Sequence, residues 1–150
     1  MTSYDPRIHH RRSIRLQGYD YASAGAYFVT LCTHKHELTL GTVTEARVNL
    51  SALGRVVDET WRWLAERYPY VALDAYVVMP NHLHGILCIL DDEPAPVKRK
   101  PLGRLIGAFK THSATLAAAV DANAGDPLWQ RNYYEHVIRN DRVRKAVRKY

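Results

Sequence analysis

The sequence predicts an α+β domain built on a mostly antiparallel sheet. Short segments rich in β-branched and aromatic residues follow one another across tight turns, as antiparallel strands do. Between them, two longer segments repeat apolar residues at helical spacing. Strands joined by short turns, with helices inserted among them, are typical of this class, and a chain of 150 residues suits a single domain.

The first half of the chain predicts one strand, one hairpin and one helix. Residues 25–33 (GAYFVTLCT) have the composition of a strand, and residues 38–50 alternate weakly, as in a short hairpin. Ser51 is a suitable N-cap for a helix whose apolar residues recur until it ends near Tyr68. The acidic residues of this helix, such as Asp58, are interpreted as a solvated face.

The second half predicts two adjoining strands, a helix, a short strand and a final helix. An acidic, proline-broken linker covers residues 91–96, and residues 123–127 stop the second helix. In chain order the predicted elements are residues 71–79, 82–90, 102–120 and 128–138, followed by a helix that Asn140 caps.

Composition narrows the classes of protein. No apolar run approaches the ~18 residues that span a bilayer, and the first residues lack the apolar core of a signal peptide. We therefore expect a cytoplasmic protein with no membrane partner. Residues 1–17 are polar and basic and are expected to form an arm before one domain, residues 18–150. Cys32 and Cys88 are too few for a disulfide framework and are interpreted as reduced core thiols.

Basic residues dominate the charge and gather in separate clusters. The net charge is +6, and such clusters suit a polyanionic partner because neutralising phosphates drives nucleic-acid binding. A solvated basic surface without a partner is the alternative. The candidate DNA-binding residues are Arg11, Arg12, Arg15, Arg104, Lys110, Arg131, Arg139, Arg142, Lys145, Arg148 and Lys149.

Two histidines one residue apart form the most informative motif, in the segment Pro80-Asn81-His82-Leu83-His84. Successive side chains of a strand point to opposite faces, so His82 and His84 share one face just after a tight turn. Two imidazoles supply part of a metal site and leave positions open to water and a substrate oxygen, which suits Lewis-acid catalysis. A pair of structural histidines is the alternative. Mg²⁺ or Mn²⁺ is the expected metal, and the imidazoles favour Mn²⁺ or another transition metal in vitro.

The last predicted helix combines a basic outer face with Tyr150 at the end of its apolar face. A tyrosine that continues an apolar face is ordinarily part of a core. A phenol is also a nucleophile when a metal or neighbouring cations favour the phenolate. Docked against the histidine strand, Tyr150 would suit attack on a DNA phosphate while lysines and arginines hold the backbone.

His82-Leu83-His84 resembles the HUH motif of single-tyrosine transposases, and the chain more closely resembles the REP-associated tyrosine transposases. Segments 12–21 (RSIRLQGYDY), 27–30 (YFVT) and 129–140 (WQRNYYEHVIRN) support this likeness, which covers nearly the whole chain. The resemblance implies a ferredoxin-like sheet with helices packed on one face. It also implies metal-dependent cleavage of single-stranded DNA beside a palindromic, REP-like hairpin, through a 5′-phosphotyrosine on Tyr150 and later resealing by a 3′-OH.

The chain departs from the family pattern at its end. The pattern continues Tyr-Ile-x-x-Asn-Pro, whereas the sequence stops at Tyr150, so we expect a C-terminal helix that is truncated there. In related enzymes a polar residue one helical turn beyond the tyrosine completes the metal site, and that residue would then be absent. Either the chain is truncated or the natural protein has lost this third ligand.

Other aromatic residues compete for these roles. Tyr133 and Tyr134 are alternative nucleophiles, although packing or stacking suits them better. Trp129 and Tyr134 are candidates for stacking on unpaired bases, with the hydrophobic core as the alternative. His136 is either a spare metal ligand or an imidazole satisfied by the nearby backbone.

Three functions therefore compete. The first is a site-specific endonuclease and strand transferase for single-stranded DNA, a transposase that we expect to be a monomer, with a dimer as the other option. The second is a catalytically impaired protein that binds DNA hairpins without cutting them. The third is a metal-dependent hydrolase of small phosphoesters, which the basic clusters disfavour.

Overall fold

A computed structural model describes residues 24–90, 99–121 and 127–138 of the chain. These residues form a four-stranded sheet, a separate two-stranded hairpin and two helices. The elements in chain order are β1 (Gly25–Cys32), η1 (His34–His36), β2 (Gly41–Thr44), β3 (Arg47–Leu50), α1 (Ala52–Arg67), β4 (Val71–Met79), β5 (His82–Ile89), α2 (Leu102–Val120) and β6 (Tyr134–Ile138).

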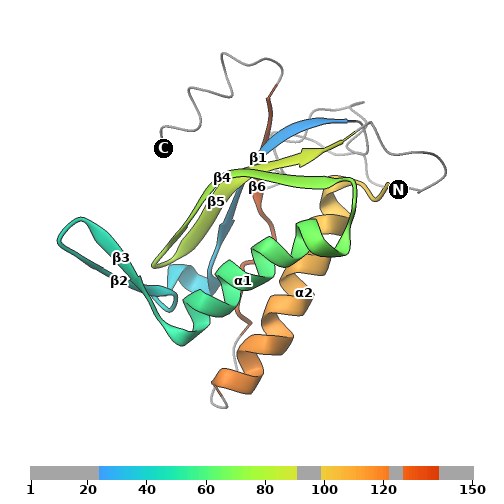
Figure 1. The fold of residues 1–150 in the computed structure, drawn as a ribbon. Helices are drawn as coiled ribbons and strands as arrows, with labels where there is room; N and C mark the ends of the chain where they lie inside the picture. The colour runs from blue at the N-terminus through green and yellow to red at the C-terminus, as the bar shows by residue number, and fades with distance from the viewer. Residues whose placement is uncertain (1–23, 91–98, 122–126, 139–150) are drawn as a thin grey trace, which may run out of the picture.

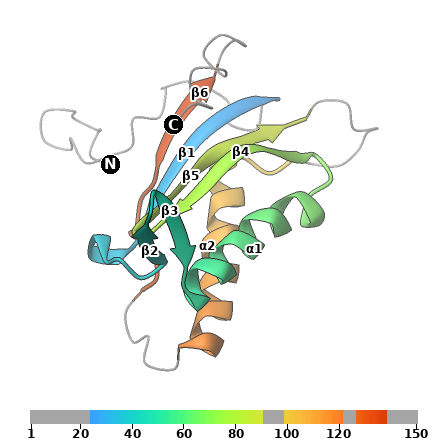
Figure 2. The same cartoon turned by 60° about the vertical axis from the view of Figure 1, so that its left-hand side comes forward.

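The four-stranded sheet has the ferredoxin-like topology. Its strand order is β4-β5-β1-β6, and each neighbouring pair is antiparallel. With the β2–β3 hairpin set aside, the chain runs β-α-β-β-α-β, so each helix connects two strands that are not neighbours. Both helices lie on the same face of the sheet, and the β2–β3 hairpin projects from one end (Figures 1 and 2). The predicted α+β fold with a mostly antiparallel sheet is confirmed.

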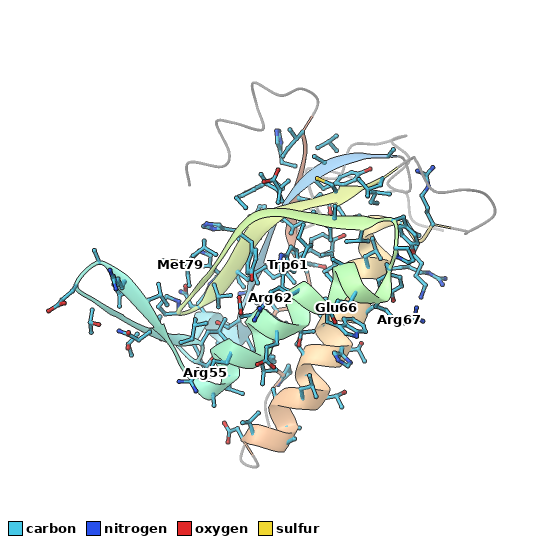
Figure 3. All side chains as sticks on the ribbon, viewed as in Figure 1. Arg55, Trp61, Arg62, Glu66, Arg67 and Met79 are labelled. Carbon is cyan, nitrogen blue, oxygen red and sulfur yellow. The ribbon has the colours of Figure 1, made fainter. Side chains whose placement is uncertain are left out.

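Alternate residues of the central strands build the core against the helices. Tyr27, Val29 and Leu31 of β1 are completely buried, whereas the residues between them are only partly covered. Trp61 of α1 lies between that helix and the sheet (Figure 3) and meets Phe109 of α2 edge to face, with ring centroids 5.4 Å apart. This period of two means that the other face of the same strands is free for a different use.

The first helix begins where the sequence predicts. The Ser51 hydroxyl accepts a hydrogen bond from the Gly54 amide at 3.1 Å and donates one to the Thr39 carbonyl at 2.7 Å. The cap therefore joins the helix to the chain segment that leads into β2. Along the outer side of α1 lie the exposed side chains of Arg55, Arg62, Glu66 and Arg67 (Figure 3).

Asp58 corrects the predicted solvated face of α1. Its carboxylate accepts hydrogen bonds of 2.7 Å from Arg62 and from the Tyr76 hydroxyl. Burial and this bond to Asp58 raise the pKa of Tyr76 to about 12. The reason for the error is that β4 packs against α1 and brings Tyr76 within reach, a contact that helical spacing alone does not reveal.

The predicted elements otherwise agree with the described ones. The strand at 71–79, the helix at 102–120 and the strand that starts at His82 have the predicted ends or lie within one residue of them. The short strand predicted within 128–138 is β6. The arm at 1–17, the linker at 91–96 and the helix after Asn140 lie outside the described residues. Of the helices in the described parts, none is long and apolar enough to cross a membrane.

Candidate active site

The face of the sheet opposite the helices carries the histidine pair. On β5, His82 lies between Cys32 of β1 and Met79 of β4, and His84 lies between Thr30 and Val77. The intervening Leu83 is completely buried on the helix side. Both imidazoles therefore project from the open face, the face of the sheet opposite α1 and α2, as the spacing predicts.

The two rings are close enough to share a ligand. Their centroids are 5.2 Å apart, with 40° between the planes. Nδ1 of His82 lies 2.9 Å from Oδ1 of Asn81. Because the amide oxygen can only accept, Nδ1 is the protonated nitrogen, and Nε2 of His82 keeps its lone pair for another partner. Metal-binding histidines are commonly oriented in this way by a neighbouring polar group.

His84 presents a buried nitrogen without a protein partner. Its Nε2 is shielded from solvent and has no hydrogen bond with any described residue. The ring also lies beside Phe28 of β1, with centroids 5.8 Å apart. Leaving a buried polar atom unsatisfied costs roughly 1–3 kcal/mol, so this nitrogen is a site where a ligand would stabilise the protein.

The turn before β5 is held by the segment that follows β1. Thr33, which is 1% exposed, donates to the Asn81 carbonyl through its backbone amide at 3.0 Å and through its hydroxyl at 3.1 Å. The hydroxyl also lies 2.7 Å from the Glu37 carbonyl, and the Leu40 amide donates to the Pro80 carbonyl at 2.9 Å. These bonds fix the residues that immediately precede His82.

A third imidazole, which the sequence analysis did not single out, lies near the pair. Burial lowers the pKa of His82, and the neighbouring imidazoles of His84 and His36 lower it further. His36 follows Lys35 in a segment where both residues have a φ of 55°, a left-handed conformation uncommon outside glycine. The side-chain amide nitrogen of Gln130 lies 2.9 Å from Nε2 of His36 and donates to it. The sequence signal was the cluster His34-Lys35-His36 at the end of a predicted strand.

The structure assigns different positions to the candidate DNA-binding residues that it describes. Arg131 is exposed in the segment that leads into β6, whereas Arg104 is exposed on α2, in the helix layer and away from the histidine pair. The ammonium group of Lys110 donates to the carbonyls of Gln130, Arg131 and Asn132, at 2.8, 3.3 and 3.2 Å. Its burial lowers its pKa. Lys110 thus positions the segment before β6, and its contact with DNA stays a prediction.

The aromatic residues of the 129–134 segment separate into two groups. Trp129 is 6% exposed, and its Nε1 donates to the Ser113 hydroxyl at 2.9 Å, which identifies it as a core residue. Tyr133 is partly buried beside the Lys110 ammonium, 5.7 Å from the ring centroid. Tyr134 is 63% exposed on β6. Of the two candidates for base stacking, only Tyr134 has a ring that a base can reach.

The remaining predicted site residues lie outside the described residues. They are Tyr150, Arg11, Arg12, Arg15, Arg139, Arg142, Lys145, Arg148 and Lys149. Within the described ranges, no group of three or more histidine, cysteine, aspartate or glutamate side chains could hold a metal ion. The two histidines of the open face do not by themselves make up such a group within the described residues.

The chain has a sequence relative and several structural neighbours among known proteins. No protein-family model matches the chain. An uncharacterized protein of Haemophilus influenzae (strain Rd) is 35% identical over 164 residues, which cover 99% of this chain and 90% of that protein.

The structural neighbours establish the fold. A structure of a REP-associated tyrosine transposase bound to a REP hairpin superposes with a TM-score of 0.64 at 16% identity, over 91% of this chain and 68% of that one. The crystal structure of a candidate transposase from Deinococcus radiodurans R1 gives a TM-score of 0.55 at 20% identity, over 91% of this chain and 93% of that one. At these identities the likeness is one of fold, and the function has to be argued from the site.

Proposed function

We propose that this chain is a transposase that cuts and rejoins single-stranded DNA beside a palindromic hairpin. The chain belongs to the same family as the uncharacterized Haemophilus influenzae protein. The observation that carries the proposal is the pair His82 and His84, side by side on the open face of this fold. The REP-associated transposase that shares the fold has a REP hairpin bound to it. A REP-like hairpin is therefore the substrate that we propose for this protein. We propose that the protein acts as a monomer in the cytoplasm.

The histidine pair fits a divalent metal ion. His82 directs its protonated nitrogen to Asn81 and keeps the other for a ligand, and His84 has a buried nitrogen with no partner among the described residues. These two nitrogens are the proposed protein ligands of Mg²⁺ or Mn²⁺. Such an ion, when bound, polarises a phosphate oxygen and leaves its other positions to water and substrate. The role of the chain is to hold both rings on one rigid strand.

Tyr150 is the proposed nucleophile. Its phenolic oxygen attacks the phosphorus of the scissile phosphodiester, forms a 5′-phosphotyrosine bond and releases a 3′-hydroxyl on the upstream DNA. A later attack by a 3′-hydroxyl on the phosphotyrosine forms a new DNA phosphodiester and frees the phenol. The number of phosphoester bonds is unchanged in each step, so rejoining needs no external energy source.

Basic residues supply the affinity for the DNA backbone in this proposal. The net charge of +6 favours a polyanion. Arg131 lies beside the strand that carries Tyr134, and Arg104 lies on the helix layer, so we propose that they contact different parts of the DNA. The cationic residues near both termini, from Arg11 to Arg15 and from Arg139 to Lys149, are proposed to contact the hairpin.

The experiment that tests the function is the trapping of a covalent protein–DNA adduct. Single-stranded hairpin oligonucleotides, labelled at the 5′ or the 3′ end, are incubated with the protein in Mn²⁺ or in EDTA and separated on denaturing gels. We expect an adduct only in Mn²⁺ and only with the label downstream of the cut. Tyr150→Phe should abolish it, and Tyr134→Phe, which removes the phenol of the exposed alternative, should not.

Two outcomes would redirect the proposal. An adduct that persists in Tyr150→Phe and disappears in Tyr134→Phe would move the nucleophile to β6. Tight, salt-sensitive hairpin binding without any adduct would favour the protein that binds hairpins but does not cut them. Hydrolysis of small phosphoesters by a protein that does not bind DNA would overturn both the transposase proposal and the hairpin-binding alternative.

A further inference from the structure

Tyr134 lies in register with the histidine pair on the open face of the sheet. The antiparallel pairings place Tyr134 of β6 beside Thr30 of β1, Thr30 beside His84 of β5, and His84 beside Val77 of β4. Residues paired in this way project from the same face. One straight row across all four strands therefore joins an exposed phenol to the candidate active site.

The surroundings of this row suit a nucleobase. The neighbouring row on the same face places Phe28 between Ile86 and the exposed His136. Along β1, β5 and β6, the described positions that face this side carry no acidic side chain, and the one glutamate of β6 points to the other face. Ile86 is only 1% exposed, whereas His136 in the same row and Tyr134 in the neighbouring one are exposed, so the β6 side of the face is accessible to a ligand.

A single residue of β1 separates Tyr134 from His84 along the row. Two interstrand spacings separate the backbones at Tyr134 and His84, which amounts to about 10 Å. The short Thr30 side chain lies between them. A base over the phenol ring would thus leave its own sugar-phosphate within reach of the imidazoles.

We propose that Tyr134 is a stacking residue that holds an unpaired DNA base beside the phosphate to be cut. The proposal deepens the proposed function and rests on it, since the occupant of the open face is single-stranded DNA. An exposed aromatic ring on a sheet gives sequence-tolerant stacking with unpaired bases. In this proposal the exposed Arg131, three residues before Tyr134, contacts an adjoining phosphate. Tyr134 acts here by positioning the strand, and its hydroxyl takes no part.

The test uses oligonucleotides in which 2-aminopurine replaces one base at a time on either side of the hairpin. Stacking on the ring of Tyr134 should quench the fluorescence of 2-aminopurine at one or two adjacent positions of the oligonucleotide. Tyr134→Phe keeps the ring and should keep both the quenching and the affinity. Tyr134→Leu should lose the quenching and bind the single-stranded flank about ten-fold more weakly. Val43→Ala, at an exposed apolar residue of the β2–β3 hairpin, is the matched control and should change neither.

The readouts separate failure of this inference from failure of the function. Unchanged quenching and unchanged affinity for the single-stranded flank in Tyr134→Leu would overturn the stacking role. A metal-dependent adduct in the same samples would still support the proposed transposase function. A loss in Tyr134→Phe equal to that in Tyr134→Leu would assign the effect to the hydroxyl and also overturn the proposal. Circular dichroism of each variant identifies any loss that comes from misfolding. Self-association of the wild type that Tyr134→Leu abolishes, without any effect on DNA, would make this face a protein contact instead.

Discussion

The two faces of β5 differ in what their side chains do. Leu83 and Leu87 point toward the helices and are completely buried among apolar neighbours. His82 and His84, which alternate with them, point to the open face and are only partly covered. One strand thus supplies the core with one set of residues and the candidate active site with the other. We infer that the buried, helix-facing side chains of β5 hold the strand in place and so make the candidate site on its other face rigid.

The cost of the site is visible on the open face. A core histidine would have hydrogen-bond partners for both ring nitrogens, yet Nε2 of His84 has none within the described residues. His82 has its pKa lowered chiefly by burial, so its neutral form is favoured. The unsatisfied nitrogen reduces the stability of the free protein, and the lowered pKa of His82 reduces it only at acidic pH. Both features suit the binding of a cation by an imidazole.

The largest effect should come from removing both imidazoles from the open face. His82→Gln combined with His84→Gln keeps polar side chains of similar size and should reduce adduct formation about 100-fold or more, because the proposed metal ion would stabilise the transition state by several kcal/mol. Thermal unfolding without metal should change little, since His84 gives up an unsatisfied nitrogen. Quantitative gels in Mn²⁺ give the first result and calorimetry in EDTA the second. An unchanged adduct yield in the double variant would exclude the pair from catalysis.

The opposite pattern should follow from a change on the covered face. Leu83→Ala, between the two histidines, should lower the free energy of unfolding by about 2–5 kcal/mol, because the buried side chain leaves a cavity. Below the unfolding transition the variant should still form the adduct, since the imidazoles keep their strand. Denaturant titration and adduct gels at low temperature measure the two quantities. Full stability in Leu83→Ala would contradict the assignment of this face to the core.

A change at Thr33 tests how far the hydrogen bonds at the turn before β5 support the position of His82. Thr33→Val keeps the shape but removes the hydroxyl that reaches the Glu37 and Asn81 carbonyls, and should cost about 1–2 kcal/mol of unfolding free energy. Adduct formation should fall several-fold, because Asn81 orients His82. Thr33→Ser restores the hydroxyl and is the matched control. Equal activity of Thr33→Val and Thr33→Ser would limit Thr33 to a structural role.

Much of the fold could be predicted because its signals are local. The period of two on β1 and β5, the helical spacing of α1 and α2 and the Ser51 cap each act over a few residues. The shared face of His82 and His84 follows from the same period, so the heart of the candidate site was also predictable. The ferredoxin-like strand order came from the resemblance to a family, and the pairings of β1 confirm it.

Contacts between distant segments could not be predicted in the same way. Lys110 belongs to a helix, yet its ammonium is engaged by three carbonyls of the segment before β6. His36 lies near the histidine pair in a segment after β1 that contains left-handed residues. Asp58 meets Tyr76 across two elements. In each case tertiary packing decides the partner of a polar group, and the residues next to that group in the sequence do not identify the partner.

The smallest expected effect is the pH dependence that His82 contributes to the stability of the metal-free protein. Its pKa in the folded state lies below the ordinary value of 6.5, so between these two values the unfolded chain binds more protons than the folded one. Stability from this group is therefore complete above pH 6.5 and is lost as the pH falls through that value toward the folded pKa. In EDTA, the melting temperature of the wild type should drop more between pH 7.5 and 5.5 than that of His82→Gln. Parallel curves of melting temperature against pH for the two proteins would show that the imidazole of His82 is as well solvated in the folded protein as in the unfolded chain. Desolvation would then not account for a preference for its neutral, metal-binding form.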